Sequence, residues 1–134
     1  MKVSVIKQYS VFMPNRPGAL ADLTEPFGAA GFNLLGISSE VREDSALVRL
    51  AVEADQDCSA VLSKAGFASV EGRLLSIEID DVPGRLGELT RRLGKAGVNI
   101  STVYGSSAGH NACRILIAAE NTEKALKLLG ADGS

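Results

Sequence analysis

The sequence predicts an α+β protein built from two tandem copies of one βαββαβ unit, and three observations support this prediction. Residues 17–33 (PGALADLTEPFGAAGFN) recur without a gap as residues 83–99 (PGRLGELTRRLGKAGVN), with nine identities in seventeen positions. An alternating apolar stretch precedes each copy, and two further strand patterns and a helix pattern follow it. Self-similarity at a fixed period indicates duplicated structural units. We therefore expect one unit over residues 1–71 and a second over residues 72–134.

Each unit is expected to open with a strand and continue into a helix. Alternation predicts the strands, through Tyr9, Val11 and Met13 and through Leu75, Ile77 and Ile79. Helical spacing predicts the helices, through Leu20, Leu23, Phe27 and Ala30 and through Leu86, Leu89, Leu93 and Ala96. Pro17 and Pro83 suit the first turn of a helix, where φ is already set and no backbone N–H is missed. Gly31 and Gly97 suit the left-handed residue that ends a helix.

A hairpin and a second helix complete the order in each unit. Strand patterns cover about residues 33–41 with 46–53, and 98–105 with 112–119. The alternation in the second strand of each pair differs in parity between the copies, so the hairpin loops must differ by an odd number of residues. Asp55 and Asn121 are predicted N-caps of the second helices. This order is that of a ferredoxin-like sandwich with both helices on one sheet face.

The closing strand is clear in only one unit. A short strand at about residues 67–71 closes the first, whereas residues 130–134 are too short and polar to close the second. The second opening strand, Leu74–Asp80, would then present unpaired backbone groups, which proteins usually cover. We expect the leading stretch Lys2–Ile6 or a partner chain to pair there.

Composition excludes several classes of function. Of 134 residues 46% are hydrophobic and 22% charged, and the net charge is −2, which predicts a packed core and argues against a nucleic-acid partner. No apolar run is long enough to span a bilayer and no leader pattern opens the chain, so we expect a cytoplasmic protein. Cys58 and Cys113 are too few for a metal or disulfide framework, and no metal or cofactor is expected.

The turn that enters each repeated helix is the best candidate for a binding site. It reads NRPGAL at residues 15–20 and DVPGRL at residues 81–86. Glycine at a helix start exposes backbone N–H groups to a carboxylate, and Asn15 or Asp81 could accept a hydrogen bond from an ammonium group. The alternative interpretation is structural, with these side chains serving only as helix caps.

These motifs resemble the ACT domain, a family that regulates amino-acid metabolism by binding amino acids. The likeness lies in the Asn/Asp-x-Pro-Gly-x-Leu turn, the Ala-Gly-x-Asn helix exit and the βαββαβ order, and the tandem arrangement is similar to stand-alone two-ACT proteins. The resemblance implies a non-catalytic sensor in which one or both copies bind a free amino acid. The implied site residues are Asn15, Gly18, Ala19, Leu20 and Asn33 in the first copy and Asp81, Gly84, Arg85, Leu86 and Asn99 in the second.

Rival functions fit the sequence less well. An acylphosphatase-like enzyme would need placed arginines, but Arg16 and Arg85 are not equivalent under the repeat, and His110 stands without a partner for general-base catalysis. Gly84–Gly87 resembles the GXXG loop of KH domains, yet the stacking aromatics are missing.

The remaining alternative is a pair of ACT units that acts only as a protein-interaction or oligomerisation module. Small βαββαβ units bury little apolar surface, and the apolar Phe12 is expected on the sheet face away from the helices. A homodimer is therefore expected, together with an enzyme or regulator of amino-acid metabolism as partner.

Overall fold

The computed structural model describes residues 1–107 and 111–130. His110, the only histidine of the sequence, lies outside the described residues. Helices and strands alternate along the chain as two successive βαββα series. The chain divides into two compact units. We call residues 6–72 the N-unit, and residues 1–5 together with the described part of 73–134 the C-unit. The expected boundaries were 1–71 and 72–134, so the first five residues belong with the other unit.

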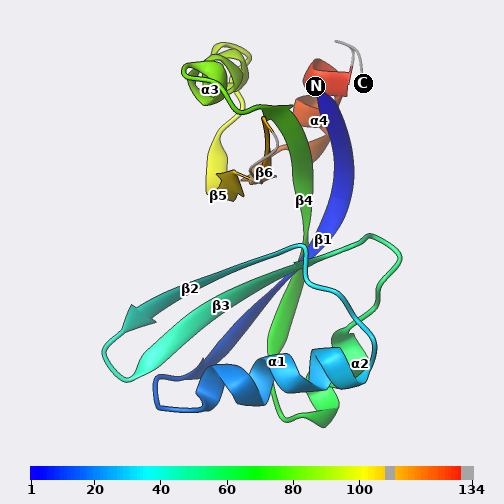
Figure 1. The fold of residues 1–134 in the computed structure, drawn as a ribbon, viewed down its shortest axis with the longest axis vertical. Coiled ribbons are helices and arrows are strands. Elements are labelled where there is room, and N and C mark those ends of the chain that lie inside the picture. The colour runs from blue at the N-terminus through cyan, green and yellow to red at the C-terminus, as the bar shows by residue number, and fades with distance from the viewer. Residues whose placement is uncertain (108–110, 131–134) are drawn as a thin grey trace. The chain divides into compact units, whose positions relative to one another are not determined.

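The N-unit is a four-stranded sheet with two helices on one face (Figure 1). Its strand order is β2-β3-β1-β4, and β3 pairs antiparallel with both β1 and β2. The elements are β1 (Lys2–Pro14, from Ile6 on), α1 (Ala19–Ala29), β2 (Gly36–Arg42), β3 (Ser45–Val52), α2 (Ser59–Lys64) and the start of β4 (Ser69–Asp80). The order is βαββαβ, as predicted.

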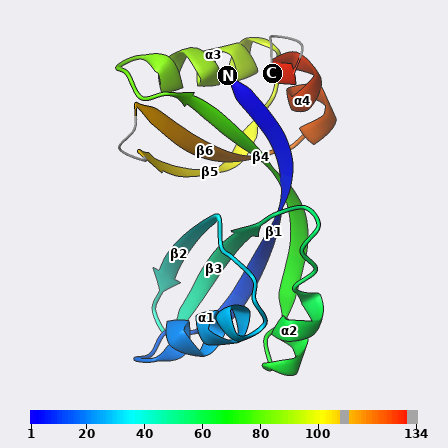
Figure 2. The same cartoon turned by 45° about the vertical axis from the view of Figure 1, so that its right-hand side comes forward.

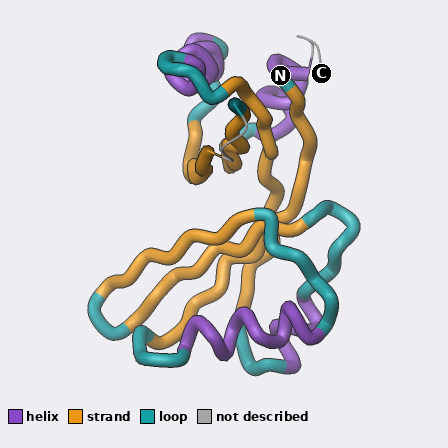
Figure 3. Tube along the Cα trace, in the orientation of Figure 1, coloured by secondary structure: helices purple, strands orange, loops and turns teal. Residues whose placement is uncertain are grey.

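The C-unit repeats this plan with the strand order β1-β4-β6-β5, and α3 and α4 lie against its sheet in Figure 2. The elements are β4 from Arg73 on, α3 (Arg85–Lys95), β5 (Ile100–Ser107), β6 (Ala112–Ala119) and α4 (Thr122–Gly130). The order of strands and helices is the same in both halves of the chain, and Figure 3 distinguishes the two kinds of element along the trace. The α+β class and the tandem ferredoxin-like units are therefore confirmed.

The first residues of the chain close the sheet of the C-unit. β1 neighbours β4 in the sheet, and Met1–Val5 cluster with the C-unit. Val3 and Val5 pack against the C-unit core. The predicted pairing of the leading stretch with Leu74–Asp80 is thus confirmed, and it covers backbone groups of β4 that would otherwise form an exposed strand edge.

Each unit has its own apolar core between sheet and helices. In the N-unit it comprises Tyr9, Val11, Met13, Ala19, Leu23, Phe27, Val48, Leu50, Val52, Cys58 and Leu62. In the C-unit it comprises Leu75, Ile77, Leu89, Leu93, Val98, Ile115, Ile117, Ala125 and Leu129. The predicted strand alternation and helical spacing account for most of these positions. Aliphatic burial at about 25 cal/mol per Å² is the main stabilising contribution in both units.

The helix ends agree with the sequence in part. Gly31 and Gly97 have φ of 80° and 78°, the left-handed conformation predicted after each helix. Pro17 and Pro83, however, precede the N-cap glycines, which have φ of 83° and 92°. The prediction that proline lies in the first turn of each helix was therefore wrong. The left-handed glycine is needed to turn the chain from strand to helix, and this pushes proline outside the helix.

The second helices also differ from one another at their starts. Asn121 caps α4 as predicted, because its Oδ1 accepts a hydrogen bond from the Lys124 backbone N–H at 3.0 Å. α2 begins at Ser59, so the prediction of Asp55 as its N-cap was wrong. Asp57 instead accepts a hydrogen bond from the Ser59 backbone N–H at 3.1 Å.

The two hairpins differ by one residue in register. Ile37 faces Leu50 in the N-unit, and Val103 faces Ile117 in the C-unit. Val103 thus follows Ile37 by 66 residues, whereas Ile117 follows Leu50 by 67. This confirms the parity argument, and it fixes which residues of the two units occupy equivalent positions around the helix-entry turns.

Candidate ligand-binding site

A pocket of about 200 Å³ lies at the helix-entry turn of the N-unit. We call it the N-pocket. Its walls come from the end of β1, the turn, the first turn of α1 and the β2–β3 hairpin. The lining residues are Met13, Pro14, Asn15, Arg16, Ala19, Leu20, Ser39, Val41, Ala46 and Val48.

A second pocket, of about 210 Å³, lies at the helix-entry turn of the C-unit. We call it the C-pocket. The lining residues are Ile79, Asp80, Asp81, Val82, Arg85, Leu86, Gly105, Ser106, Ser107, Cys113 and Ile115. Every residue that lines the N-pocket has its repeat equivalent in the lining of the C-pocket. The offset between equivalent residues is 66 through the second strand of each unit and 67 in the third strand. The duplication has therefore produced two copies of one concave surface.

Equivalent hydrogen bonds hold both turns to the neighbouring hairpin. The Asn15 backbone N–H donates to the Asp44 carbonyl at 2.8 Å, and the Asp81 backbone N–H donates to the Asn111 carbonyl at 3.0 Å. The side chains are held differently. Asn15 Nδ2 donates to the Glu43 carbonyl at 3.1 Å, whereas Asp81 Oδ2 accepts from the Ser107 hydroxyl. The Asn15 amide oxygen and the Asp81 carboxylate are thereby both fixed at the pocket.

Each pocket also contains one arginine, paired with a carboxylate on its helix. Arg16 Nη2 lies 2.7 Å from Asp22 Oδ2, and Arg85 Nη1 lies 3.1 Å from Glu88 Oε2. Asp22 and Glu88 are equivalent under the repeat, but the two arginines are not. The two equivalent carboxylates are thus paired with arginines that come from non-equivalent positions of the turn. Both pairs are solvent-exposed, so their contribution to folding stability is small.

The structure brings together some, but not all, of the predicted site residues. Six line the pockets: Asn15, Ala19 and Leu20 in one unit, and Asp81, Arg85 and Leu86 in the other. Gly18 and Gly84 shape the turns without lining the pockets. Asn33 and Asn99 follow the far ends of α1 and α3, about 15 Å along the helix at 1.5 Å per residue. Asn99 Nδ2 donates there to Glu120 Oε1 at 2.8 Å.

The strand walls of both pockets were missed by sequence reasoning. They comprise Ser39, Val41, Ala46 and Val48 in the N-unit and Gly105, Ser106, Ser107, Cys113 and Ile115 in the C-unit. The hairpin shift of one residue hides their equivalence in a gapless repeat comparison. The parity difference between the copies was the signal that could have revealed it.

Gly105 is required by close packing in the C-pocket. A Cβ there would lie 2.5 Å from the Arg114 carbonyl oxygen and 2.9 Å from Ile115 Cδ1. We expect Gly105→Ala to destabilise the protein by about 1–3 kcal/mol, because backbone must shift to accommodate the methyl group.

Gly87 is a matched control for this substitution. It lies inside α3, where an added Cβ meets nothing within 4 Å, so Gly87→Ala should stabilise by about 0.5–1 kcal/mol through helix propensity. Urea unfolding of both variants measures the difference. Equal effects of the two substitutions would contradict the packing argument.

Cys113 places a thiol within the C-pocket. Burial raises the pKa of this thiol, and the neighbouring Asp81 carboxylate raises the pKa further. The thiol therefore remains protonated near neutral pH, and nucleophilic chemistry, which needs the thiolate, is not favoured. Cys58 is fully buried in the N-unit core, and burial raises its pKa as well.

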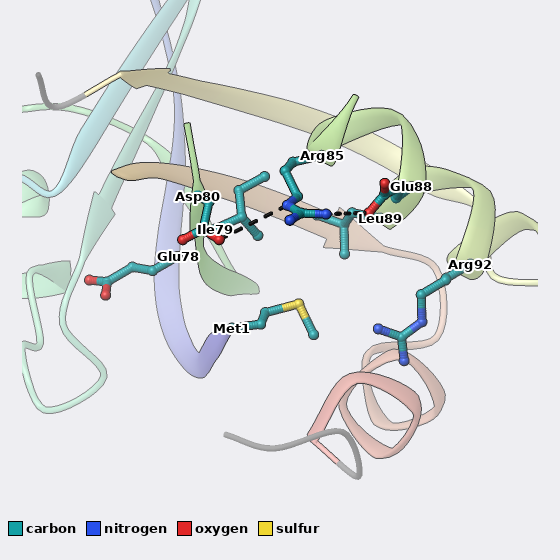
Figure 4. A pocket seen from close by; sticks show the side chains of 8 residues that line it. All are labelled: Met1, Glu78, Ile79, Asp80, Arg85, Glu88, Leu89 and Arg92. Atoms are coloured by element: carbon teal, nitrogen blue, oxygen red, sulfur yellow. Dashed lines mark hydrogen bonds and ion pairs between the residues drawn. The ribbon is translucent and has the colours of Figure 1, made fainter. Parts of the chain in front are cut away.

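A larger cavity of about 430 Å³ adjoins the C-pocket within the C-unit. It shares Ile79, Asp80 and Arg85 with the C-pocket. Figure 4 shows Arg85 between Asp80 and Glu88, with Arg92 farther along α3 and Met1 across the cavity. Arg85 Nε lies 4.0 Å from Asp80 Oδ2. Its positive charge is therefore countered on both sides.

Residues 1–107 and 111–130 hold neither a metal-binding cluster nor a membrane-spanning helix. These residues contain no group of three or more His, Cys, Asp or Glu side chains arranged to hold a metal ion. None of their helices is long and apolar enough to cross a membrane.

Part of this chain matches a known family model, and solved structures share its fold. Residues 10–64 match the family model of the ACT domain. No curated protein matches the chain in sequence. A crystal structure of a Bacteroides thetaiotaomicron protein aligns with a TM-score of 0.86 and 25% identity, covering 96% of this chain and 89% of that one.

Regulatory subunits of aspartate kinase share the fold. The subunit from Thermus thermophilus aligns with a TM-score of 0.69 and 17% identity, covering 100% of this chain and 98% of that one. The subunit from Thermus flavus aligns with a TM-score of 0.63 and 17% identity, covering 98% and 96%. The resemblance to the ACT domain is thus confirmed for residues 10–64, and the internal repeat and the shared fold extend the likeness to the second unit.

Proposed function

We propose that this protein is a non-catalytic regulator that binds a free amino acid in the N-pocket, the C-pocket or both. The observation that carries the proposal is the arginine–carboxylate pair at each turn, reached by Arg16 in one unit and Arg85 in the other. A feature present in both copies, although its arginines come from non-equivalent positions, is better explained by a shared ligand requirement than by the repeat alone.

The polar groups of each pocket complement a zwitterion. A guanidinium recognises a carboxylate through two parallel hydrogen bonds, and Arg16 or Arg85 would exchange part of its contact with the helix carboxylate for the ligand. The Asn15 amide oxygen or the Asp81 carboxylate would accept hydrogen bonds from the ligand ammonium. The apolar walls, which include Leu20 and Leu86, would contact the ligand side chain.

The size of the pockets favours a small ligand. About 200 Å³ is below the roughly 300–1,000 Å³ typical of drug-sized ligands. The fold shared with regulatory subunits of aspartate kinase supports an enzyme or regulator of amino-acid metabolism as the partner that responds to occupancy. Coupling then requires that the ligand and the partner each bind two states of the protein with different affinities.

Thermal unfolding against a panel of the twenty amino acids tests this proposal. A ligand that binds only the folded state stabilises it by about 2.7 kcal/mol at a hundredfold excess over Kd, so we expect a selective rise in the midpoint. Asn15→Ala or Asp81→Ala should abolish the rise while the unliganded midpoint changes little, because both side chains are exposed. No shift with any amino acid, for a protein that unfolds cooperatively, would overturn the proposal.

The second candidate is an ACT pair that acts only through protein contacts. It is favoured by the outer face of the N-unit sheet, where Phe12 is 64% exposed beside Leu47 in a hollow of about 350 Å³. The equivalent positions of the C-unit carry the ion pair of Glu78 with Arg114 instead. A homodimer through the Phe12 face remains a prediction under either function, and sedimentation equilibrium at several concentrations measures it.

A further inference from the structure

We infer that the two pockets select different ligands: the C-pocket an amino acid with a positively charged side chain, and the N-pocket one with an uncharged aliphatic side chain. This inference rests on the proposed function and assigns a ligand class to each copy. It follows from four differences between equivalent positions of the two pockets.

The first difference is the charge of the residues that line the pocket. Asp80 and Asp81 stand in the C-pocket where Pro14 and Asn15 stand in the N-pocket. Arg85 does not compensate both carboxylates, because Glu88 lies closer to it, at 3.1 Å, than Asp80 does, at 4.0 Å. With Glu88 included, three carboxylates face one arginine, as Figure 4 shows for Asp80, Arg85 and Glu88.

The N-pocket is electrically balanced by comparison. Arg16 is its only charged lining residue, and Asp22 neutralises it at 2.7 Å. A zwitterion with a neutral side chain therefore leaves this pocket balanced. The same ligand would leave two uncompensated carboxylates in the C-pocket, and a second positive charge on the ligand reduces that excess.

The other differences lie in the strand walls, where the ligand side chain would extend. Ser107 replaces Val41, and Cys113 replaces Ala46. Val41 is 55% exposed and offers an aliphatic surface. Ser107 carries a hydroxyl that already donates to Asp81. The C-pocket thus presents hydrogen-bonding groups at positions where the N-pocket presents methyl groups.

Lysine and norleucine form a suitable pair of probes, because lysine is norleucine with an ammonium group at the end of its side chain. Alkylation of Cys113 by iodoacetamide at about pH 8.5, near the usual pKa of a thiol, reports occupancy of the C-pocket. The fully buried Cys58 serves as an internal control in the same digest. The double variant Ala46→Cys, Cys113→Ala moves the reporting thiol to the equivalent place in the N-pocket.

We expect lysine to protect Cys113 at a concentration about fivefold or more below that of norleucine, as a partly exposed charge pair allows. The order should reverse for the thiol at position 46. The preference at Cys113 should shrink in high salt, because screening weakens exposed charge pairs.

Reciprocal substitutions provide the matched test. Asp81→Asn should remove most of the preference of the C-pocket for lysine, and Asn15→Asp should create such a preference in the N-pocket. Asp81→Asn keeps an oxygen that can accept from the Ser107 hydroxyl, whereas Asn15→Asp loses the amide that donates to the Glu43 carbonyl. The unliganded unfolding midpoint of each variant therefore serves as its folding control.

Two outcomes would overturn the inference, and they differ in what they say about the proposed function. Protection of both thiols with no difference between lysine and norleucine, unchanged by the reciprocal substitutions, overturns the ligand assignment and leaves the sensor function standing. Protection of neither thiol by these probes or by any of the twenty amino acids overturns both.

Discussion

Val5→Asp is expected to destabilise the C-unit by about 3 kcal/mol, whereas Ser4→Asp, one residue earlier on the same strand, should change its stability by less than 1 kcal/mol. Val5 packs against the C-unit core, and Ser4 is exposed. Both substitutions add one carboxylate to the same edge strand, so their difference isolates the burial of the side chain.

Hydrogen exchange read by mass spectrometry is the measurement for this pair. Loss of the closing strand should expose the backbone of β4, so amides of Leu75–Ile79 should lose protection in Val5→Asp and keep it in Ser4→Asp. The paired strands β2 and β3 of the N-unit provide the internal reference. If the two variants exchange alike, β1 does not close the C-unit in solution.

Tyr9→Phe should destabilise the N-unit by about 1–3 kcal/mol, the cost of leaving a buried donor without its acceptor. The Tyr9 hydroxyl accepts a hydrogen bond from the Cys58 backbone N–H and donates one to Glu71 Oε1, both at 3.0 Å. Tyr9 is completely buried and joins β1 to the start of α2 and to β4. The hydroxyl thus holds the closing strand of the N-unit to its core.

The same residue predicts how stability depends on alkaline pH. Burial raises the pKa of the Tyr9 hydroxyl above its usual value of 10.0. The folded protein therefore retains this proton at a pH where the unfolded chain has released it. The contribution of Tyr9 is fully present below the unfolded pKa and is lost as pH rises through the folded pKa.

Urea unfolding of the wild type and Tyr9→Phe from pH 8 to 11 tests this sign. The free-energy difference between the two proteins should be constant up to about pH 10 and shrink above it. Comparison of the two proteins cancels the contribution of every group that they share. A difference that stays constant to the alkaline limit, or grows, would show that Tyr9 is not held protonated by the fold.

The sequence by itself determined the repeat, the element order and the turns. A gapless match of residues 17–33 with 83–99 requires two similar units. Strands and helices could be predicted because their periods of two and 3.6 residues depend only on residues that are close in sequence. The turn residues Asn15 and Asp81 could be predicted as site candidates for the same reason, because a helix start offers its unpaired N–H groups wherever it occurs.

Only the tertiary structure decided which distant segments meet. The leading stretch and a partner chain would satisfy the same backbone hydrogen bonds of Leu74–Asp80, so the sequence could not distinguish them. The structure shows the leading stretch in that place. It left Asn33 and Asn99 outside the two pockets, because each follows the far end of its helix. It also placed Ser107 and Cys113 in one pocket with Asp81. The longer hairpin shifts the register of the third strand of the C-unit by one residue, and local propensity does not specify such a register.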